Sequence, residues 1–338
     1  MWQLGDAELL AAWQPLPRVT QLQDRHLFPR EDRVVFYEHD HSYLVDGVRV
    51  PRSVTSLLHA YATPFEPTRA LACMKRRDWD VKREAMEQQG LGTSDEDIMA
   101  RWRRNGEVQS KRGTLLHYHA ECLLNGVEVD EPQSPEFVQV RTLYRALLLR
   151  GMTPHSTELC VFHCGLRVAG QIDALFLDAD CKLVIVDWKR VRNLRTEGFD
   201  PSRYPLDRLP DSNYWIYSLQ LNLYRYILET EYAHDVAAMY LAVVHPKQPL
   251  PRLVEVPRLE AEMRALHDFE LEQGRAVSSA PSLDSPFEYP RNVRRARSIV
   301  FGSQQLAFEQ CLPRSRARWF PRPWRRSLIR PRCQRPRA

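Results

Sequence analysis

Residues 170–189, GQIDALFLDADCKLVIVDWK, constrain the fold more than any other stretch of the chain. Two apolar runs flank a polar turn, which predicts two β-strands joined as a hairpin. Side chains alternate between the faces of a strand, so Asp187 and Lys189 project together while Trp188 faces the other way. Asp173 lies on the neighbouring strand, which brings a second carboxylate to the same hairpin.

These acids and the lysine indicate a chemistry as well as a fold. A carboxylate at the end of an apolar strand is costly to bury unless it binds a cation or a hydrogen-bond donor. Asp173 and Asp187 can share one or two magnesium ions through their oxygens. Lys189 then lies where it can orient, or help deprotonate, a water that attacks a phosphodiester. An isolated D-x-K triplet more often belongs to a solvated surface hairpin, because such triplets are common in any charged chain, so the pattern needs support from residues elsewhere.

The length and composition are those of a globular protein with a substantial core. The chain has 338 residues, of which 43% are hydrophobic. It contains no apolar run of membrane-spanning length, and its first residues lack the features of a secretory signal, which predicts an intracellular protein. The seven cysteines are an odd number without a CxxC pair, which argues against a disulfide framework or a zinc module.

The formal net charge of +5 is unevenly distributed along the chain. Residues 291–338 contain fourteen arginines and one acid, a net charge of +13, which leaves −8 for residues 1–290. An acidic body can still bind nucleic acid, because the basic surface near a site decides binding. We divide the chain into four parts: an N-terminal extension (1–32), a hairpin and helical region with basic clusters (33–104), a core (105–275) and, where the composition shifts to Ser, Pro and Arg, a flexible basic tail (276–338).

The part of the chain before the core gives few chemical signals. The first 32 residues carry no recognisable chemistry, and residues 34–50 have the pattern of two strands with a polar turn. Basic clusters are candidates for contacts with phosphates, and the alternative for any one of them is a solvated helix face. The clusters nearest the predicted hairpin and helix are Lys111 with Arg112, and Arg190 with Arg192.

One predicted helix and one predicted strand add candidate site residues. Gly113, His117 and Glu121 are spaced four apart and therefore lie on one helix face. A lone histidine on a helix is most often a packed or surface residue, so the interest of His117 comes from its neighbours. Glu158 precedes the hairpin on a separate strand and is either a further acid of the site or a surface residue at a strand end.

A second predicted helix, residues 212–229, is strongly apolar and aromatic. Its aromatic residues are typical of a core. Gln220 differs, because an amide within so apolar a helix needs a hydrogen-bond partner. Tyr224 follows four residues later on the same face.

Five features then stand in one order along the chain: G-x-x-x-H at Gly113 to His117, an acid at Glu158, G-x-x-D at Gly170 to Asp173, D-W-K at Asp187 to Lys189, and Q-x-x-x-Y at Gln220 to Tyr224. The ordered set resembles the RecB-type exonuclease branch of the PD-(D/E)XK nuclease superfamily, over roughly residues 105 to 265. Within that branch the sequence also looks like the mitochondrial genome maintenance exonucleases and their viral relatives, although the shared motifs are those of the whole branch.

The resemblance implies a fold and a set of roles. The fold is α/β, with a restriction-endonuclease-like core: a central mixed sheet flanked by the His117 helix and the Gln220 helix, and an N-terminal helical and hairpin extension. Mg²⁺ or Mn²⁺ is the implied cofactor. The implied metal ligands are His117, Asp173, Asp187 and the main-chain carbonyl of Trp188; Lys189 is the catalytic lysine, Gln220 and Tyr224 hold the substrate or brace the site, and Glu121 and Glu158 are positions at which the branch varies.

Some members of the branch also carry an iron-sulfur cluster, held by one cysteine before the core and three after it. Only Cys311 and Cys333 follow the core here, so we expect no such cluster. The function implied is a metal-dependent nuclease acting on DNA, from ends or on single strands, in repair, recombination or replication. The alternatives are a nucleic-acid-binding protein of the same fold without turnover, and an RNA-binding or nuclear-import role for the arginine-rich tail.

Overall fold

The computed structural model describes residues 4–274, apart from residues 27, 29, 77, 131, 132 and 199. The described residues belong to one compact unit, and the predicted basic tail lies outside them. Within this described part, no helix combines the length and the apolar character needed to cross a lipid bilayer.

The hairpin predicted around the two aspartates is present. Its strands, β6 (Val168–Leu177) and β7 (Leu183–Arg190), pair antiparallel. In the turn between them, Asp178 Oδ1 accepts hydrogen bonds from the backbone amides of Asp180 and Lys182, both at 2.9 Å. An aspartate that bonds to the backbone in this way stabilises a tight reversal of the chain.

This hairpin lies at the centre of a six-stranded mixed sheet, which confirms the predicted α/β class. The strand order is β4-β6-β7-β8-β9, and β5 pairs with the remaining edge of β6. Pairing is parallel between β4 and β6 and between β7 and β8, and antiparallel elsewhere. The other strands are β4 (Arg52–Ser53), β5 (Thr153–His163), β8 (Val236–Val244) and β9 (Arg252–Glu255).

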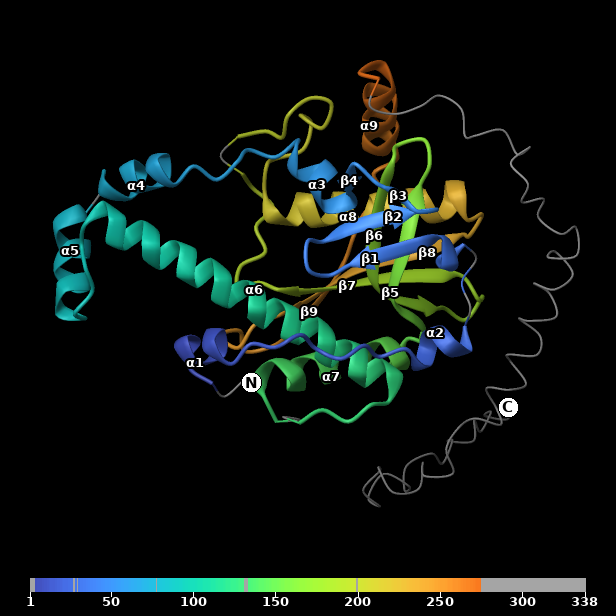
Figure 1. The fold of residues 1–338 in the computed structure, drawn as a ribbon, viewed down its shortest axis with the longest axis horizontal. Coiled ribbons are helices and arrows are strands. Elements are labelled where there is room, and N and C mark those ends of the chain that lie inside the picture. Colours follow the sequence, from blue (N-terminus) through green and yellow to red (C-terminus); the bar gives the residue numbers. More distant parts are fainter. Residues whose placement is uncertain are drawn as a thin grey trace, which may run out of the picture. The chain divides into compact units, whose positions relative to one another are not determined.

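Helices cover both faces of the sheet (Figure 1). On one face lie α6 (Asp95–Asn125) and α7 (Pro135–Leu149), which share a buried cluster with β7 and β8. On the other face lie α3 (Val54–His59), α8 (Asn213–Glu231) and α9 (Glu260–Glu272). The helices of His117 and Gln220 therefore flank the sheet, as predicted, and the structure places them on opposite faces.

The side-chain alternation predicted for β7 is also confirmed. Leu183 and Ile185 pack in the cluster with α8, whereas Val184, Val186 and Trp188 pack in the cluster with α6 and α7. Each strand residue is committed to one face, because a shift of one position would exchange the two sets.

Helix α6 is longer than the sequence pattern indicated. It begins after Ser94, whose hydroxyl accepts a hydrogen bond from the amide of Asp97, and it ends at Gly126, which has a φ of 72°. The boundary placed between residues 104 and 105 therefore falls inside one continuous helix. Beside its first half lie α4 (Pro67–Lys75) and α5 (Trp79–Gln88) (Figure 1).

The N-terminal extension packs against the core. Its helices are α1 (Asp6–Ala11) and α2 (Gln21–Arg25). A separate three-stranded sheet follows, where two strands were predicted: β1 (Val34–Tyr37), β2 (Ser42–Val45) and β3 (Val48–Arg49). Buried residues of this part belong to the two main hydrophobic clusters: Leu22 packs in the cluster with α6 and α7, and Phe28, Val34 and Tyr43 pack in the cluster with α8. This part of the chain therefore helps to bury the core.

Candidate active site

The β6–β7 ladder opens at the two aspartates. Backbone pairing runs from Leu177 and Leu183 to Ala174 and Val186, and it stops just before Asp173 and Asp187. Beyond that point β7 stays paired only with β8. The carboxylate of Asp173 fills the opening, where its Oδ2 accepts a hydrogen bond of 2.8 Å from the amide of Trp188.

Three side chains from three elements converge on this opening. His117 of α6, Glu158 of β5 and Asp173 of β6 each offer a ligand atom, and these atoms lie within 4.8 Å of one another. His117 Nδ1 lies 3.4 Å from Asp173 Oδ2. We call these three residues the metal triad. One imidazole nitrogen and two carboxylate oxygens form a donor set that suits a divalent cation.

Glu158, left open by the sequence, is a member of the triad. The register pairs Thr157 with Ala174 and Leu159 with Ile172, so Glu158 lies opposite Asp173. Its φ is 50°, in the left-handed region that few non-glycine residues adopt. Strained backbone of this kind persists only where the surroundings hold it.

Two glutamine side chains supply that support. Gln171 Nε2 donates to the carbonyl of Glu158 at 3.1 Å, and Gln23 Nε2 donates to the carbonyl of Thr157 at 2.8 Å. Gln171 comes from β6 and Gln23 from α2, so the N-terminal extension takes part in fixing this acid. No spacing rule in the sequence connects these residues.

Asp187 and Lys189 form a pair of their own on the α8 side of β7. Lys189 Nζ lies 2.9 Å from Oδ1 and 2.7 Å from Oδ2 of Asp187. Asp187 is not a member of the metal triad among the described residues, and its buried Oδ2 accepts no well-directed hydrogen bond. Its role as a metal ligand stays a prediction, as does that of the Trp188 carbonyl.

The site concentrates acidic groups in surroundings that resist charge. Burial raises the pKa of Glu158 well above its usual range, and the Asp173 carboxylate raises it further. Burial also raises the pKa of Asp187 to about 6, against the opposing charge of Lys189. Burial would raise the pKa of Asp173 too, but the charge and hydrogen bond of His117 hold it below its usual value. The neighbouring acids therefore need added positive charge before all of them can ionise.

The two bases of the site are held in their charged forms. Burial alone would lower the pKa of His117, but the Asp173 carboxylate outweighs it and raises that pKa to about 9. The pKa of Lys189 is likewise raised, because the charge of Asp187 outweighs the effect of burial. Asp173 and Asp187 thus each hold one cationic side chain.

The metal triad lines a cavity of about 640 Å³. Gly113, Glu121, Gln220 and Tyr224, all predicted as parts of the site, line the same cavity. Burial raises the pKa of the Glu121 carboxyl to about 7. A smaller cavity of about 170 Å³ is lined by Lys189, and Gln220 is common to both cavities.

The Q-x-x-x-Y motif is explained by packing against β6. A Cβ atom at Gly170 would lie 2.8 Å from Tyr224 Cε1 and 3.0 Å from its hydroxyl oxygen, so only glycine leaves room for the ring. Gln220 lies four residues before Tyr224 on α8, and both side chains line the cavity. Gly170 therefore makes room for the Tyr224 ring, and the roles of Gln220 and Tyr224 in holding the substrate or bracing the site stay predictions.

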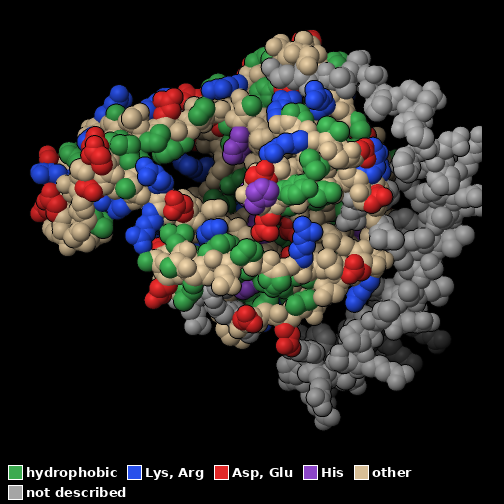
Figure 2. Space-filling model, in the orientation of Figure 1, with side chains coloured by type: hydrophobic (Ala, Val, Ile, Leu, Met, Phe, Trp, Pro, Cys, Tyr) green, Lys and Arg blue, Asp and Glu red, His purple; other side chains and the backbone are tan. Residues whose placement is uncertain are grey.

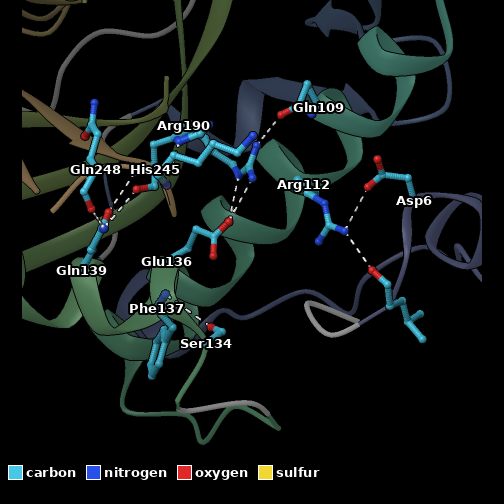
Figure 3. Close-up of polar contacts among 12 residues, drawn as sticks. Asp6, Gln109, Arg112, Ser134, Glu136, Phe137, Gln139, Arg190, His245 and Gln248 are labelled. Atoms are coloured by element: carbon cyan, nitrogen blue, oxygen red, sulfur yellow. Dashed lines mark hydrogen bonds and ion pairs between the residues drawn. The ribbon is translucent and has the colours of Figure 1, made fainter. Parts of the chain in front are cut away.

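The four predicted phosphate-binding cations have different placements. Arg190 was predicted to bind nucleic acid or to brace the site; its guanidinium is buried and lies 3.0 Å and 3.2 Å from Glu136 Oε1, so it is engaged within the protein (Figure 3). Arg112 donates to the Leu4 carbonyl and lies 3.3 Å from Asp6 (Figure 3). Lys111 lies over the Trp13 ring at 4.5 Å, and Arg192 is exposed.

Comparison with known proteins gives only distant similarity. No family model matches the chain, and no curated protein matches it. One similar solved structure is that of a Eubacterium rectale protein described as a "Putative exonuclease", with a TM-score of 0.31 and 12% identity, over 50% of this chain and 73% of that chain. Another is the structure of a protein named SSO0001, with a TM-score of 0.25 and 15% identity, over 49% of this chain and 86% of that chain.

Proposed function

We propose that this protein is a metal-dependent nuclease that hydrolyses phosphodiester bonds in DNA, acting on single strands or ends, with a place in DNA repair, recombination or replication. The observation that carries the proposal is the metal triad, which lies where β6 and β7 separate. Lys189 lies on the adjoining strand, two residues beyond Asp187, a third acid. Cation ligands and a nearby amine are the groups that phosphodiester hydrolysis needs.

The residues present fit a divalent cation. The triad offers hard oxygen ligands and one imidazole nitrogen within reach of a single ion. Asp187 lies at the same opening of the ladder, where its Oδ2 is 2.7 Å from Lys189 Nζ. We propose Mg²⁺ or Mn²⁺ as the bound cation, held by His117, Glu158 and Asp173, with Asp187 as a further ligand.

Such a cation, when bound, supplies positive charge at the scissile phosphate and lowers the pKa of water. The chain supplies the rest of the chemistry. Lys189 is held by Asp187 and lies 5.0 Å from the centre of the Tyr217 ring, so its ammonium has a fixed place beside the opened ladder. Because its pKa is raised, we propose that Lys189 acts as a charged donor that orients water and stabilises the developing negative charge.

A cleavage assay with a matched variant tests this function. The purified protein is incubated with end-labelled single-stranded DNA and Mn²⁺ or Mg²⁺, alongside Lys189→Ala and a chelator control. We expect cleavage by the wild type, none in chelator, and a loss of about 10²–10⁴-fold in rate for Lys189→Ala. Blunt duplex DNA and RNA of the same sequence serve as further substrates.

Two results would contradict the proposal. Cleavage that survives in Lys189→Ala at the wild-type rate would come from another nuclease in the preparation. DNA binding without cleavage by the wild type under any metal condition would instead favour a binding protein that lacks turnover.

A further inference from the structure

The N-terminal extension, which gave no chemical signal in the sequence, lines the same cavity as the metal triad. Residues 16–20 and Gln23 contribute to it, and the β1–β2 hairpin contributes Phe36, His41 and Tyr43. We call these residues of the extension and of the hairpin that follows it the N-terminal wall. The catalytic candidates and the N-terminal wall therefore line one cavity.

The N-terminal wall is anchored to the residues that position Glu158. The amide of Leu22 donates to Asn125 Oδ1 at 2.7 Å, and Asn125 Nδ2 donates to Thr157 Oγ1 at 3.0 Å. Gln23 donates to the Thr157 carbonyl next to Glu158. The hydrogen bonds of Leu22 and Gln23 thus hold the wall to Asn125 and Thr157, and Thr157 directly precedes Glu158. The wall therefore has a fixed place relative to the metal triad.

Arg18 is the one Lys or Arg among the described residues that line this cavity. It is exposed, and no ion pair or hydrogen bond to its side chain is found in the described part of the chain. The same cavity is lined by the acidic residues Glu121 and Glu158 and by Asp173. The nearby Lys111 and Arg112 are already engaged with Trp13, Leu4 and Asp6.

The wall also offers aromatic surface. The rings of Phe36 and Tyr43 lie 4.8 Å apart, and both line the cavity. Aromatic side chains beside a cation that can bind phosphate are the two elements with which proteins hold single-stranded nucleic acid, through base stacking and charge. Residues 1–290 carry a net charge of −8, so a phosphate chain needs a local cation to enter.

The size of the cavity limits what can enter it. Its volume of about 640 Å³ falls within the range of about 300–1,000 Å³ that holds a drug-sized ligand. A paired duplex segment is larger. Figure 2 shows acidic and histidine side chains gathered near the centre of the face that carries β1 and β2.

We infer that the N-terminal wall binds one strand of nucleic acid at the scissile site, with Arg18 contacting a phosphate and Phe36 stacking on a base. This inference rests on the proposed nuclease function and adds the substrate class, a single strand, together with the residues that select it. It gives the N-terminal extension a substrate-binding role.

Oligonucleotide binding with a matched pair of arginine variants tests the inference. Arg18→Ala is compared with Arg25→Ala, because Arg25 is exposed in the same extension but does not line the cavity. The probe is a labelled short single-stranded DNA, titrated in Ca²⁺, which shares the oxygen preference of Mg²⁺. Arg18→Lys keeps the charge, and Arg18→Glu reverses it.

We expect Arg18→Ala to weaken binding about 5- to 10-fold and to reduce the slope of log K against log salt by about one, as loss of one phosphate contact does. Arg18→Glu should weaken binding further, Arg18→Lys should restore most of it, and Arg25→Ala should match the wild type. In cleavage, Arg18→Ala should raise KM more than it lowers kcat. Phe36→Ala should weaken binding about 5- to 100-fold.

The outcomes separate this inference from the proposed function. A wild type that cleaves DNA while Arg18→Ala and Arg18→Glu keep its affinity and salt slope would overturn the role of Arg18 alone. Equal affinity for a blunt duplex and a single strand would overturn the substrate class. A wild type that neither binds nor cleaves would overturn both the inference and the function beneath it.

Discussion

Gly170 shows how the absence of one side chain shapes the site. The Tyr224 ring occupies the space where a Cβ would lie, 2.8 Å from the nearest ring carbon. Gly113 lines the same cavity but has no atom within 4 Å of its Cβ position, outside its own helix. The two glycines of these motifs therefore have different roles: Gly170 makes room for the packed Tyr224 ring, and Gly113 leaves the cavity open.

We predict that Gly170→Ala destabilises the protein by about 1–3 kcal/mol and lowers nuclease activity, because the added methyl displaces the Tyr224 ring, which lines the cavity. Gly113→Ala is the control. It should be neutral or stabilise by up to about 1 kcal/mol, since alanine favours a helix interior. Denaturant unfolding and the DNA cleavage assay measure both effects. Equal stability of the two variants would show that Tyr224 does not depend on the glycine.

At the scale of elements, the end of β7 is fastened to its neighbours directly after Lys189. Arg190 joins β7 to Glu136 of α7 and to Gln109 of α6 (Figure 3). Gln139 of α7 accepts from the amide of His245, at 2.8 Å, at the end of β8 (Figure 3). These contacts fix the strand where backbone pairing to β6 has stopped, and they hold Lys189 and Asp187 at the opening.

We predict that Arg190→Ala costs about 3–5 kcal/mol of unfolding free energy, because it leaves the Glu136 carboxylate buried without a partner. Arg192→Ala, two residues away at an exposed position, should change stability by less than about 0.5 kcal/mol. The double variant Arg190→Met with Glu136→Leu should recover part of the loss. Chemical denaturation of the variants measures this. A small effect of Arg190→Ala would mean that the ion pair does not fasten β7.

The elements that the sequence predicted well are those fixed by local pattern. Strand alternation around Asp187 and Lys189 follows from a period of two, so their shared face could be read directly. The structure adds what depends on contacts between distant residues. Glu136 lies 54 positions before Arg190, and Asn125 lies 103 positions after Leu22. No local pattern could show that Arg190 is buried in an ion pair, or that Arg18 lines the cavity.

For the whole molecule, the buried acids of the site lower the stability of the folded state when they ionise, and these acids are also the groups that can hold a cation. Burial raises the pKa of Glu121 from 4.5 to about 7 and that of Asp187 from 3.8 to about 6. Above pH 4.5 the unfolded chain releases these protons while the folded protein keeps them, so stability falls as pH rises through these values. The pKa of His117, raised from 6.5 to about 9 by Asp173, acts in the same direction between those values. Asp173, whose pKa is lowered, acts only in acid.

We therefore predict that the metal-free protein loses stability as the pH rises from about 5 to about 9, by several degrees in Tm, and that Mn²⁺ or Mg²⁺ restores it most at the alkaline end. The cation binds deprotonated ligands and the folded state only, so its stabilising effect grows as protons leave. Thermal unfolding followed by circular dichroism, with chelator or with metal, measures both slopes. Glu158→Gln with Asp173→Asn removes two triad carboxylates and should abolish the metal effect while leaving the overall fold. A metal effect that is equal at all pH values, or that persists in this double variant, would place the cation elsewhere than at the opening between β6 and β7.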